Sequence, residues 1–536
     1  MTAPRPPGTA TLRAVVEWSW ELLDAEERDL ACRLTVFSGG GLSGGATLDA
    51  VESVCGIAYP EDLLASLAEK SFLDASDGRY GMLETIRAFC AEQVPDETLA
   101  TLKDAHAAYY LRLAEQAEPL LRGGEQLPWL SRLSAERDDL DAALRHLVRS
   151  APEDGLRLMA ALSWFWRLHG LAGQRVGLAR ELLDAVGPTP PPGLDEEYAL
   201  CGLNAVTGDD DERLVRADRV LATIDRQLRL PFTVVLWTLA VGPERSQDER
   251  VRAQVGDDAW GQALLAVGLG FQEQFAGRPT ASEALFARAL EGFRACGDRW
   301  GMANSLDQLG LYADWRGERA RALELIDEAL TYARELAAPE ETADLLCRRG
   351  TVLLRSGRHA EAAVDFARAA ELARGIGAHD KVAGAHWGLG DAARLAGDMA
   401  GARAHYESAL ETSARSWYSV GQTVRIFLGL GRTALAEGRA DEADDWFRQA
   451  GTLSTGGQTQ QLELAEVAEA LAARAAEPEQ AATLLGAASA LRGQLIVDDP
   501  DVTPVERRIR RLLAPDTFKK AFELGSALRE AAVREA

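Results

Sequence analysis

The sequence predicts an all-α fold in which helical hairpins stack into a solenoid. Between about residues 260 and 454, four series of residues recur with a period of about 40 positions. One extra residue precedes the last copy. The series are Gly270, Gly310, Gly350, Gly390 and Gly431; Gly277, Gly317, Gly357, Gly397 and Gly438; Ala289, Ala329, Ala369, Ala409 and Ala450; and Phe286, Ile326, Phe366, Tyr406 and Phe447. A fixed period of this length is typical of stacked supersecondary units.

One copy, residues 341–376, indicates how each unit folds. Its first half carries small and apolar residues at helical spacing, Gly357 then breaks the helix, and a second amphipathic helix follows. Gly350 lies in the middle of the first helix, where glycine costs about 1 kcal/mol relative to alanine. We therefore expect the partner helix to approach closely at Gly350. One hairpin cannot bury its apolar stripe alone, so we expect neighbouring hairpins to stack.

These units resemble the tetratricopeptide repeat. The resemblance rests on Leu389-Gly390 followed by Ala402, Tyr406 and Ala409, and on Leu430-Gly431 followed by Ala443, Phe447 and Ala450. The family period is nearer 34 residues. The longer period here is similar to that of the repeats in bacterial signalling regulators.

Composition limits the classes of function. The chain has 536 residues, of which 47% are hydrophobic and 26% charged, and its net charge is −25. Direct nucleic-acid binding needs concentrated positive charge, so we do not expect it. The six cysteines lie far apart without a CxxC motif, which favours a reduced, cytoplasmic protein. We expect neither a signal peptide nor a membrane span, and no metal or other cofactor.

Before the repeats, the pattern changes to short helices and one hairpin. Residues 1–9 are rich in Pro and Gly, and we expect them to be disordered. Helices are predicted from Thr11, with Asp24 as an N-cap and Glu27 as its capping-box partner. Asp77-Gly78 is a good turn for a β-hairpin, and a closing helix follows it. Together these elements predict a winged-helix domain.

The N-terminal strings sharpen this prediction into a second resemblance. The stretch LRAVVEWSWELLDAEERDLACRLTVFSGG, followed by residues 63–73 and 79–89, is similar to the winged-helix module of STAND-type bacterial transcriptional regulators of the SARP and LuxR-like kind. In that family the module follows an NB-ARC ATPase domain and couples it to a helical-repeat sensor. Residues 129–145, 155–170, 484–492 and the tail to Leu528 are also similar to the sensor region, whereas residues 188–256 match poorly.

The resemblance leaves two domains of the family without a counterpart. The sequence contains no GxxxxGK[ST] motif and no DNA-binding domain before the winged helix. We therefore interpret the chain as either a shortened piece or a natural short form. The predicted division is a disordered N-terminus, a winged-helix domain, the first sensor hairpins, a divergent helical region, five repeats and a C-terminal helical cap, at residues 1–9, 10–95, 96–187, 188–256, 257–455 and 456–536.

Several local patterns could carry chemistry, and each has a simpler interpretation. The candidate recognition helix at residues 47–55 contains Asp49 and Glu52 but no basic residue, so packing against another domain is favoured over base reading. Residues 41–45 fit the G-x-S-x-G motif around Ser43, but a glycine loop between helices is favoured over a nucleophile elbow. We accordingly predict no catalytic residue and no enzyme.

Histidines and aromatic residues are also interpreted as structural. His386 and His405 can approach each other across one hairpin, but no pair has the spacing of metal ligands. Trp164, Phe165 and Trp166 are predicted to be core residues rather than a ligand-stacking wall.

The concave groove of the repeats is the predicted binding site. Counting from the Leu-Gly pairs, the groove positions are Asn304, Asp307, Asp314, Asp344, Arg355, Asp391, Arg394 and Arg432. Mixed charges in register suit a peptide, a protein partner or a charged small molecule, although a merely solvated helix face is the alternative for each residue. The resemblance implies a ligand- or partner-sensing module that relays binding through the winged helix. The alternative function is a protein–protein interaction scaffold without a switch.

Overall fold

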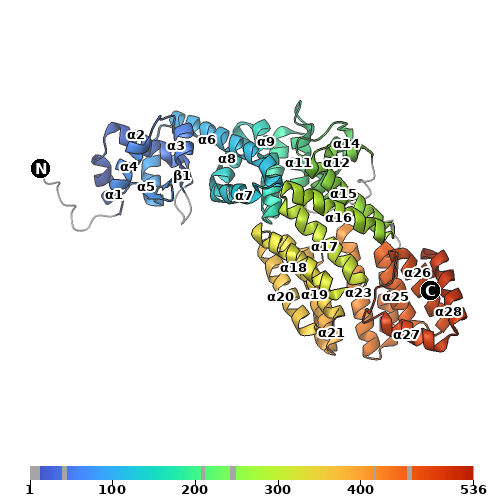
Figure 1. Ribbon diagram of the computed structural model, residues 1–536. Helices are drawn as coiled ribbons and strands as arrows, with labels where there is room; N and C mark the ends of the chain where they lie inside the picture. Colours follow the sequence, from blue (N-terminus) through green and yellow to red (C-terminus); the bar gives the residue numbers. More distant parts are fainter. Residues whose placement is uncertain are drawn as a thin grey trace. The chain divides into compact units, whose positions relative to one another are not determined.

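The computed structural model describes residues 12–38, 45–206, 212–241, 249–413, 417–454 and 461–534. Almost all regular structure in these residues is α-helical, which confirms the predicted all-α class (Figure 1). The chain forms two compact units. The first comprises residues up to 121, 127–165 and 177–201, and the second comprises residues 122–126, 166–176 and 202 onward.

The N-terminal part of the first unit combines short helices with a small antiparallel sheet in the order β1-β3-β2. Asp77 and Gly78 form the predicted turn between β2 and β3, with φ values of 50° and 74°, as a type I′ hairpin requires. Asp24 and Glu27 form the predicted capping box. The elements are α1 (Leu12–Glu21), α2 (Ala25–Arg33), the 3-10 turn Leu34–Val36, β1 (Ala46–Thr47), α3 (Leu48–Cys55), α4 (Glu61–Glu69), β2 (Asp74–Ser76), β3 (Arg79–Gly81) and α5 (Glu84–Ala91).

Longer helices follow along the chain. They are α6 (Asp96–Ala117), the 3-10 turn Glu118–Arg122, α7 (Gln126–Ala135), α8 (Arg137–Ser150), α9 (Pro152–Leu168), the 3-10 turn Ala172–Arg175, α10 (Val176–Val186), α11 (Asp195–Asn204), α12 (Glu212–Thr223), α13 (Thr233–Val241) and α14 (Glu249–Val255). Trp164, Phe165 and Trp166 in α9 are buried, as predicted for core residues.

The candidate recognition helix α3 packs on α6 within the first unit. Ala50, Val51 and Val54 of α3 are buried, and Tyr109 Oη of α6 donates a 2.8 Å hydrogen bond to Asp49. The side chain that α3 contributes to this hydrogen bond, Asp49, is acidic, and α3 contains no basic residue. This packing lies within one compact unit, whereas the sequence favoured packing against another domain.

The repeats form consecutive antiparallel hairpins in the second unit (Figure 1). In each hairpin the turn contains one glycine of the second series, and the φ values from Gly277 to Gly438 lie between 68° and 90°. That left-handed conformation explains why this series is glycine. The helices are α15 (Ala259–Phe275), α16 (Pro279–Cys296), α17 (Arg299–Trp315), α18 (Arg319–Glu335), α19 (Pro339–Arg355), α20 (His359–Ile376), α21 (His379–Leu395), α22 (Met399–Thr412), α23 (Trp417–Ala436) and α24 (Ala440–Leu453).

The first glycine series marks close contacts inside each hairpin. A Cβ atom on Gly350 would lie 2.7 Å from Cζ of Phe366, and Gly310 and Gly390 face Ile326 and Tyr406 in the same way. The large apolar series therefore packs on the glycine series of the same hairpin. This contact is the close approach that the sequence predicts.

Five helices after the repeats complete the second unit, and they share one apolar core with the last repeat. They are α25 (Gln461–Arg474), α26 (Pro478–Arg492), α27 (Thr503–Leu512), α28 (Pro515–Leu528) and α29 (Glu530–Arg534). Within the part of the chain that the structure describes, no helix combines the length and apolar character needed to cross a membrane.

Candidate functional site

The predicted groove residues lie on the first helices of successive repeats. Three of them are on α17, two on α19, two on α21 and one on α23. All but one, Asn304, are charged, and each of these charged side chains forms an ion pair. The predicted groove positions are therefore neither apolar nor unpaired charges on a solvated face.

Ion pairs connect the first helices of neighbouring repeats. Asp307 of α17 accepts a 2.9 Å hydrogen bond from Arg348 of α19. Asp344 of α19 accepts a 2.8 Å bond from Lys381 of α21. Asn304 instead donates to the carbonyl of Trp300 in its own helix. The two ion pairs link α17 to α19 and α19 to α21.

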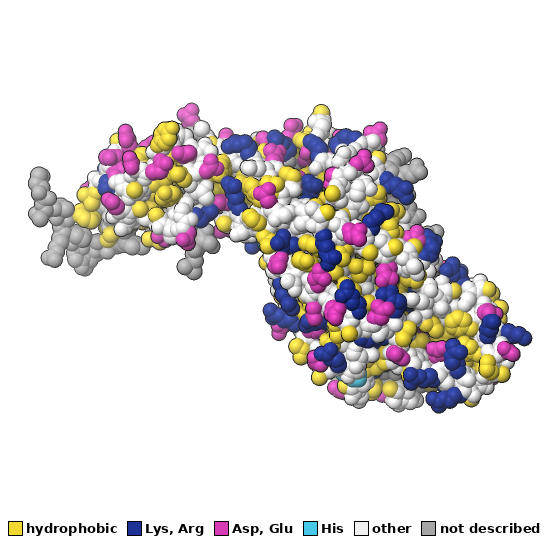
Figure 2. Space-filling model, viewed as in Figure 1, with side chains coloured by type: hydrophobic (Ala, Val, Ile, Leu, Met, Phe, Trp, Pro, Cys, Tyr) yellow, Lys and Arg dark blue, Asp and Glu magenta, His cyan; other side chains and the backbone are white. Residues whose placement is uncertain are grey.

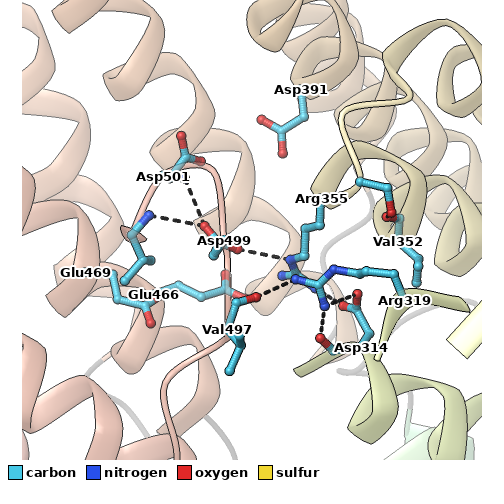
Figure 3. A network of polar contacts seen from close by, with 12 residues as sticks. Asp314, Arg319, Val352, Arg355, Asp391, Glu466, Glu469, Val497, Asp499 and Asp501 are labelled. Carbon is cyan, nitrogen blue, oxygen red and sulfur yellow. Dashed lines mark hydrogen bonds and ion pairs between the residues drawn. The ribbon is translucent and has the colours of Figure 1, made fainter. Parts of the chain in front are cut away.

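Asp314 is the most buried of the charged residues predicted to line the groove, with a side chain that is 1% exposed. It lies in the last turn of α17 and accepts hydrogen bonds from Arg319 and Arg355 (Figure 3). Burial lowers the pKa of the Arg355 guanidinium, but Asp314 and Asp499 outweigh burial and raise the pKa above its usual value. Arg355 is therefore a permanent cation held between two carboxylates.

Asp499 does not belong to the repeats. It lies in the segment Val497–Asp501, which connects α26 to α27 and reaches the ends of the first repeat helices (Figure 3). The Val497 N–H donates a 2.9 Å bond to the carbonyl of Trp315, and the Val497 carbonyl accepts from Arg319. We call Val497–Asp501 the acidic segment.

The same segment reaches two further repeats. Both Asp501 carboxylate oxygens accept 2.9 Å hydrogen bonds from Arg394, and Arg432 lies 3.4 Å from one of them. Burial raises the pKa of the Asp501 carboxyl, but Arg432 and Arg394 outweigh it and lower this pKa to about 2. Arg394 also donates to Asp391, whose carboxylate accepts a 2.6 Å bond from the Tyr406 hydroxyl.

The sequence pattern did not reveal three charged residues of this network, Arg319, Asp499 and Asp501. Arg319 begins a second helix, so it falls outside positions counted along the first helices. Asp499 and Asp501 follow no repeat period. The one signal was the run of acidic residues around Pro500, and a charge run alone does not indicate where it docks.

Other candidate positions offer less chemistry. The rings of His386 and His405 do approach, at a centroid distance of 5.7 Å, and burial, followed by His405, lowers the pKa of His386. Among the described residues, no group of three or more His, Cys, Asp or Glu side chains could hold a metal ion. Ser43 and most of its glycine motif lie outside the described residues.

The cysteines carry no sign of activation. All six are free thiols, and burial raises the pKa of Cys55, Cys90 and Cys347 to about 12. A thiol of this kind is protonated at neutral pH and is a poor nucleophile.

The surface around the repeats mixes both signs of charge. On the face drawn in Figure 2, Lys and Arg side chains lie interspersed with Asp and Glu over α17–α19. The arginines that bind the acidic segment stand out because their side chains are largely buried, with exposed fractions of 9% for Arg394 and 16% for Arg355.

Comparison with known proteins agrees with the repeat assignment. Residues 341–415 match the family model described as tetratricopeptide repeat, and this range covers α19–α22. The chain thus contains tetratricopeptide repeats arranged as a helical solenoid. Curated proteins of Mycobacterium tuberculosis and Mycobacterium bovis, provisionally named HTH-type transcriptional regulators, are 26% identical to this chain over 377 residues. The match covers 62% of this chain and only 40% of the length of those relatives.

Solved structures also align with this chain, at low sequence identity. A STAND protein with a tetratricopeptide-repeat sensor from Pyrococcus horikoshii is 14% identical, with a TM-score of 0.31, over 97% of this chain and 68% of that one. A Rap protein complexed with competence and sporulation factor is 12% identical, with a TM-score of 0.44, over 72% of this chain and 100% of that one. At these values, nothing about the ligands of those proteins carries over.

Proposed function

We propose that this chain is a non-catalytic sensing module of a STAND-type transcriptional regulator and that its repeat groove binds a peptide segment of a protein partner. One observation carries the proposal. The arginines at the ends of the repeat helices hold a short turn of polypeptide, the acidic segment, through both its main chain and its side chains. A surface that binds one such segment has the geometry for recognising another, which favours a peptide over a small molecule.

The energetic role of the groove follows from its arginines. Arg355, Arg394 and Arg432 come from three successive repeats and converge on two carboxylates. Ion pairs that are partly shielded from water are stronger than exposed ones, and arginine binds carboxylates in a fixed fork geometry. The groove is therefore suited to a segment that carries carboxylates at defined positions.

The regulatory part of the proposal concerns how binding is relayed. A solenoid consists of nearest-neighbour interfaces, so a ligand that prefers one curvature shifts the population towards it. A preference of about 1.4 kcal/mol gives a tenfold shift. We propose that α1–α5 and their small sheet form a winged helix that responds to this shift. The names of the mycobacterial relatives support a role in transcription, which the proposal extends to this chain.

Peptide binding and hydrogen exchange together test the proposal. Fluorescence anisotropy would measure the binding of acidic, neutral and basic labelled decapeptides to the whole chain. We expect binding that weakens at least tenfold in Arg394→Glu but not in Arg368→Glu, an exposed arginine of α20. Hydrogen exchange in residues 46–91 should change when the peptide binds. Binding without such a change would favour the non-switching scaffold, and no binding by any peptide would contradict the proposed function.

A further inference from the structure

The groove is not vacant in this structure, because the acidic segment occupies it. Asp499 and Asp501 face the repeats, whereas Asp498, which precedes them, is 75% exposed and lies 4.0 Å from Arg507. The segment thus presents two of its three carboxylates to the groove, and Pro500 separates these two in the sequence. Its main chain is also held on both sides of Val497, by Trp315 and Arg319.

Charge balance indicates what the groove requires. Four arginines gather at the ends of the repeat hairpins, namely Arg319, Arg355, Arg394 and Arg432. Within the repeats, the carboxylates that pair with these arginines are Asp314 and Asp391. Asp499 and Asp501 bring the number of carboxylates up to the number of arginines. Among the described residues, Asp501 is the one carboxylate within ion-pair distance of Arg432.

Removal of the segment without replacement would leave buried positive charge. Separating one partner from a buried ion pair is strongly destabilising, because the remaining charge has lost both water and counter-charge. A neutral or basic ligand would not restore the balance. An incoming segment must therefore carry carboxylates spaced as Asp499 and Asp501 are, with one residue between them.

We infer that the acidic segment is a built-in competitor of the partner: the groove recognises an acidic peptide stretch of another protein, and Val497–Asp501 occupies the same place until that stretch displaces it. The inference rests on the proposed function and adds to it the chemistry of the partner and the way binding is restrained. Because the segment belongs to the same chain, it competes at an effective concentration in the millimolar range.

The fraction of molecules in which the acidic segment is docked determines how much the apparent affinity for a peptide is reduced. A ligand that binds only the open groove has its affinity reduced by the fraction of molecules that are open. If the segment is docked in nine molecules out of ten or more, opening the groove raises the apparent affinity at least about tenfold. Weakening the segment should therefore strengthen the binding of an acidic peptide.

The test uses the full chain and a labelled synthetic peptide with the sequence of residues 493–503, GQLIVDDPDVT. The open variant combines Asp499→Asn and Asp501→Asn. Asparagine preserves the ability of residue 499 to accept hydrogen bonds from the N–H groups of Asp501 and Val502 at the start of α27. The matched control is Asp498→Asn, which removes one carboxylate from the same stretch without touching a groove arginine.

We expect the open variant to bind the peptide at least about tenfold more tightly than the wild type and the control. A peptide with asparagine at both groove-facing positions should bind to none of them. Equal affinities for the wild type and the open variant would overturn the inference while leaving the peptide-binding function intact. If this peptide does not bind but another decapeptide does, the inference is likewise overturned and the peptide-binding function stands. If no peptide binds at all, both the inference and the proposed function are contradicted.

A measurement on the wild type keeps the inference testable if the open variant does not fold. At saturating peptide, residues 493–502 should lose protection from hydrogen exchange, because the bound peptide has taken their place. Unchanged protection with the peptide bound would show that the two do not compete.

Discussion

Arg355 Nε donates a 3.0 Å hydrogen bond to Asp499 Oδ2, across 144 positions of the sequence. The same guanidinium donates to Asp314, so it joins two repeats to the stretch that precedes α27. The side chains of Arg355, Asp314 and Asp499 are 16%, 1% and 12% exposed. This relationship lends itself to direct mutational tests.

Arg355→Ala should lower the free energy of unfolding by about 3 kcal/mol, because it leaves buried carboxylates without a counter-charge. Arg319 remains beside Asp314, which keeps the loss from being larger. Urea denaturation followed by circular dichroism measures the change. Arg358→Ala is the control, since Arg358 and its partner Glu361 are both about half exposed and such ion pairs contribute little to stability. Equal losses in the two variants would contradict the structural role of Arg355.

Gly350→Leu should destabilise the protein by about 3 kcal/mol, because the new side chain would overlap the ring of Phe366. Thermal melting of the purified chain measures the effect. The control is Gly375→Ala in the neighbouring helix α20, where a Cβ atom meets nothing within 4 Å. This control should be neutral or stabilising by up to about 1 kcal/mol, since alanine is the better helix former. An unchanged melting temperature in Gly350→Leu would refute close packing at this position.

Asp298 at the start of α17 should be far more sensitive than an ordinary N-cap. Its buried carboxylate accepts hydrogen bonds from the Trp300 N–H at 2.8 Å, from Gln126 Nε2 at 3.1 Å and from Trp260 Nε1. Asp298→Ala would leave these buried donors without their acceptor, and we expect a loss of about 3 kcal/mol in urea denaturation.

Asp398 provides the comparison for that substitution. It caps α22 in the same way, but it is exposed and accepts from the Gly401 N–H alone. Asp398→Ala should cost about 1 kcal/mol. Similar losses for the two caps would mean that burial of Asp298 contributes nothing beyond capping.

Stability should depend on pH through Asp501. Its pKa is about 2 in the folded protein and about 3.9 in an unfolded chain. As the pH falls, the unfolded chain takes up this proton first, so the stabilisation is complete above about pH 4 and is lost towards pH 2. Urea denaturation between about pH 5 and pH 3 should show a smaller pH dependence for Asp501→Asn than for the wild type. Parallel curves for the two proteins would contradict the ion pairs with Arg394 and Arg432.

The repeat array was predictable because its determinants are local and periodic. Gly357 is required by a left-handed turn, and Gly350 by the ring of Phe366 in the same hairpin. The hairpin at Asp77-Gly78 was predictable for the same reason, since two adjacent residues specify the turn. In contrast, β1 is two residues long and offers no alternating pattern to detect.

The sequence predicted the arginines of the groove but not the carboxylates of the acidic segment that bind them. Counting from the Leu-Gly pairs placed Arg355, Arg394 and Arg432 on the first helices of their repeats, although their offsets from the periodic glycines differ. Their partners Asp499 and Asp501 could not be identified, since a contact between distant stretches leaves no trace in local spacing. Whether these positions bind a partner in solution stays a prediction, with the experiments above as its test.

The acidic segment also restricts how this protein can evolve. In most solenoids each unit touches only its neighbours, so duplication of one unit lengthens the array without distant consequences. Here Val497–Asp501 contacts α17, α19, α21 and α23 at once. An inserted hairpin between α18 and α23 would carry Arg432 one repeat away from Asp501. The contacts of the acidic segment therefore fix the number of repeats between α17 and α23. We expect this part of the array to gain or lose repeats less readily than the arrays of other repeat proteins.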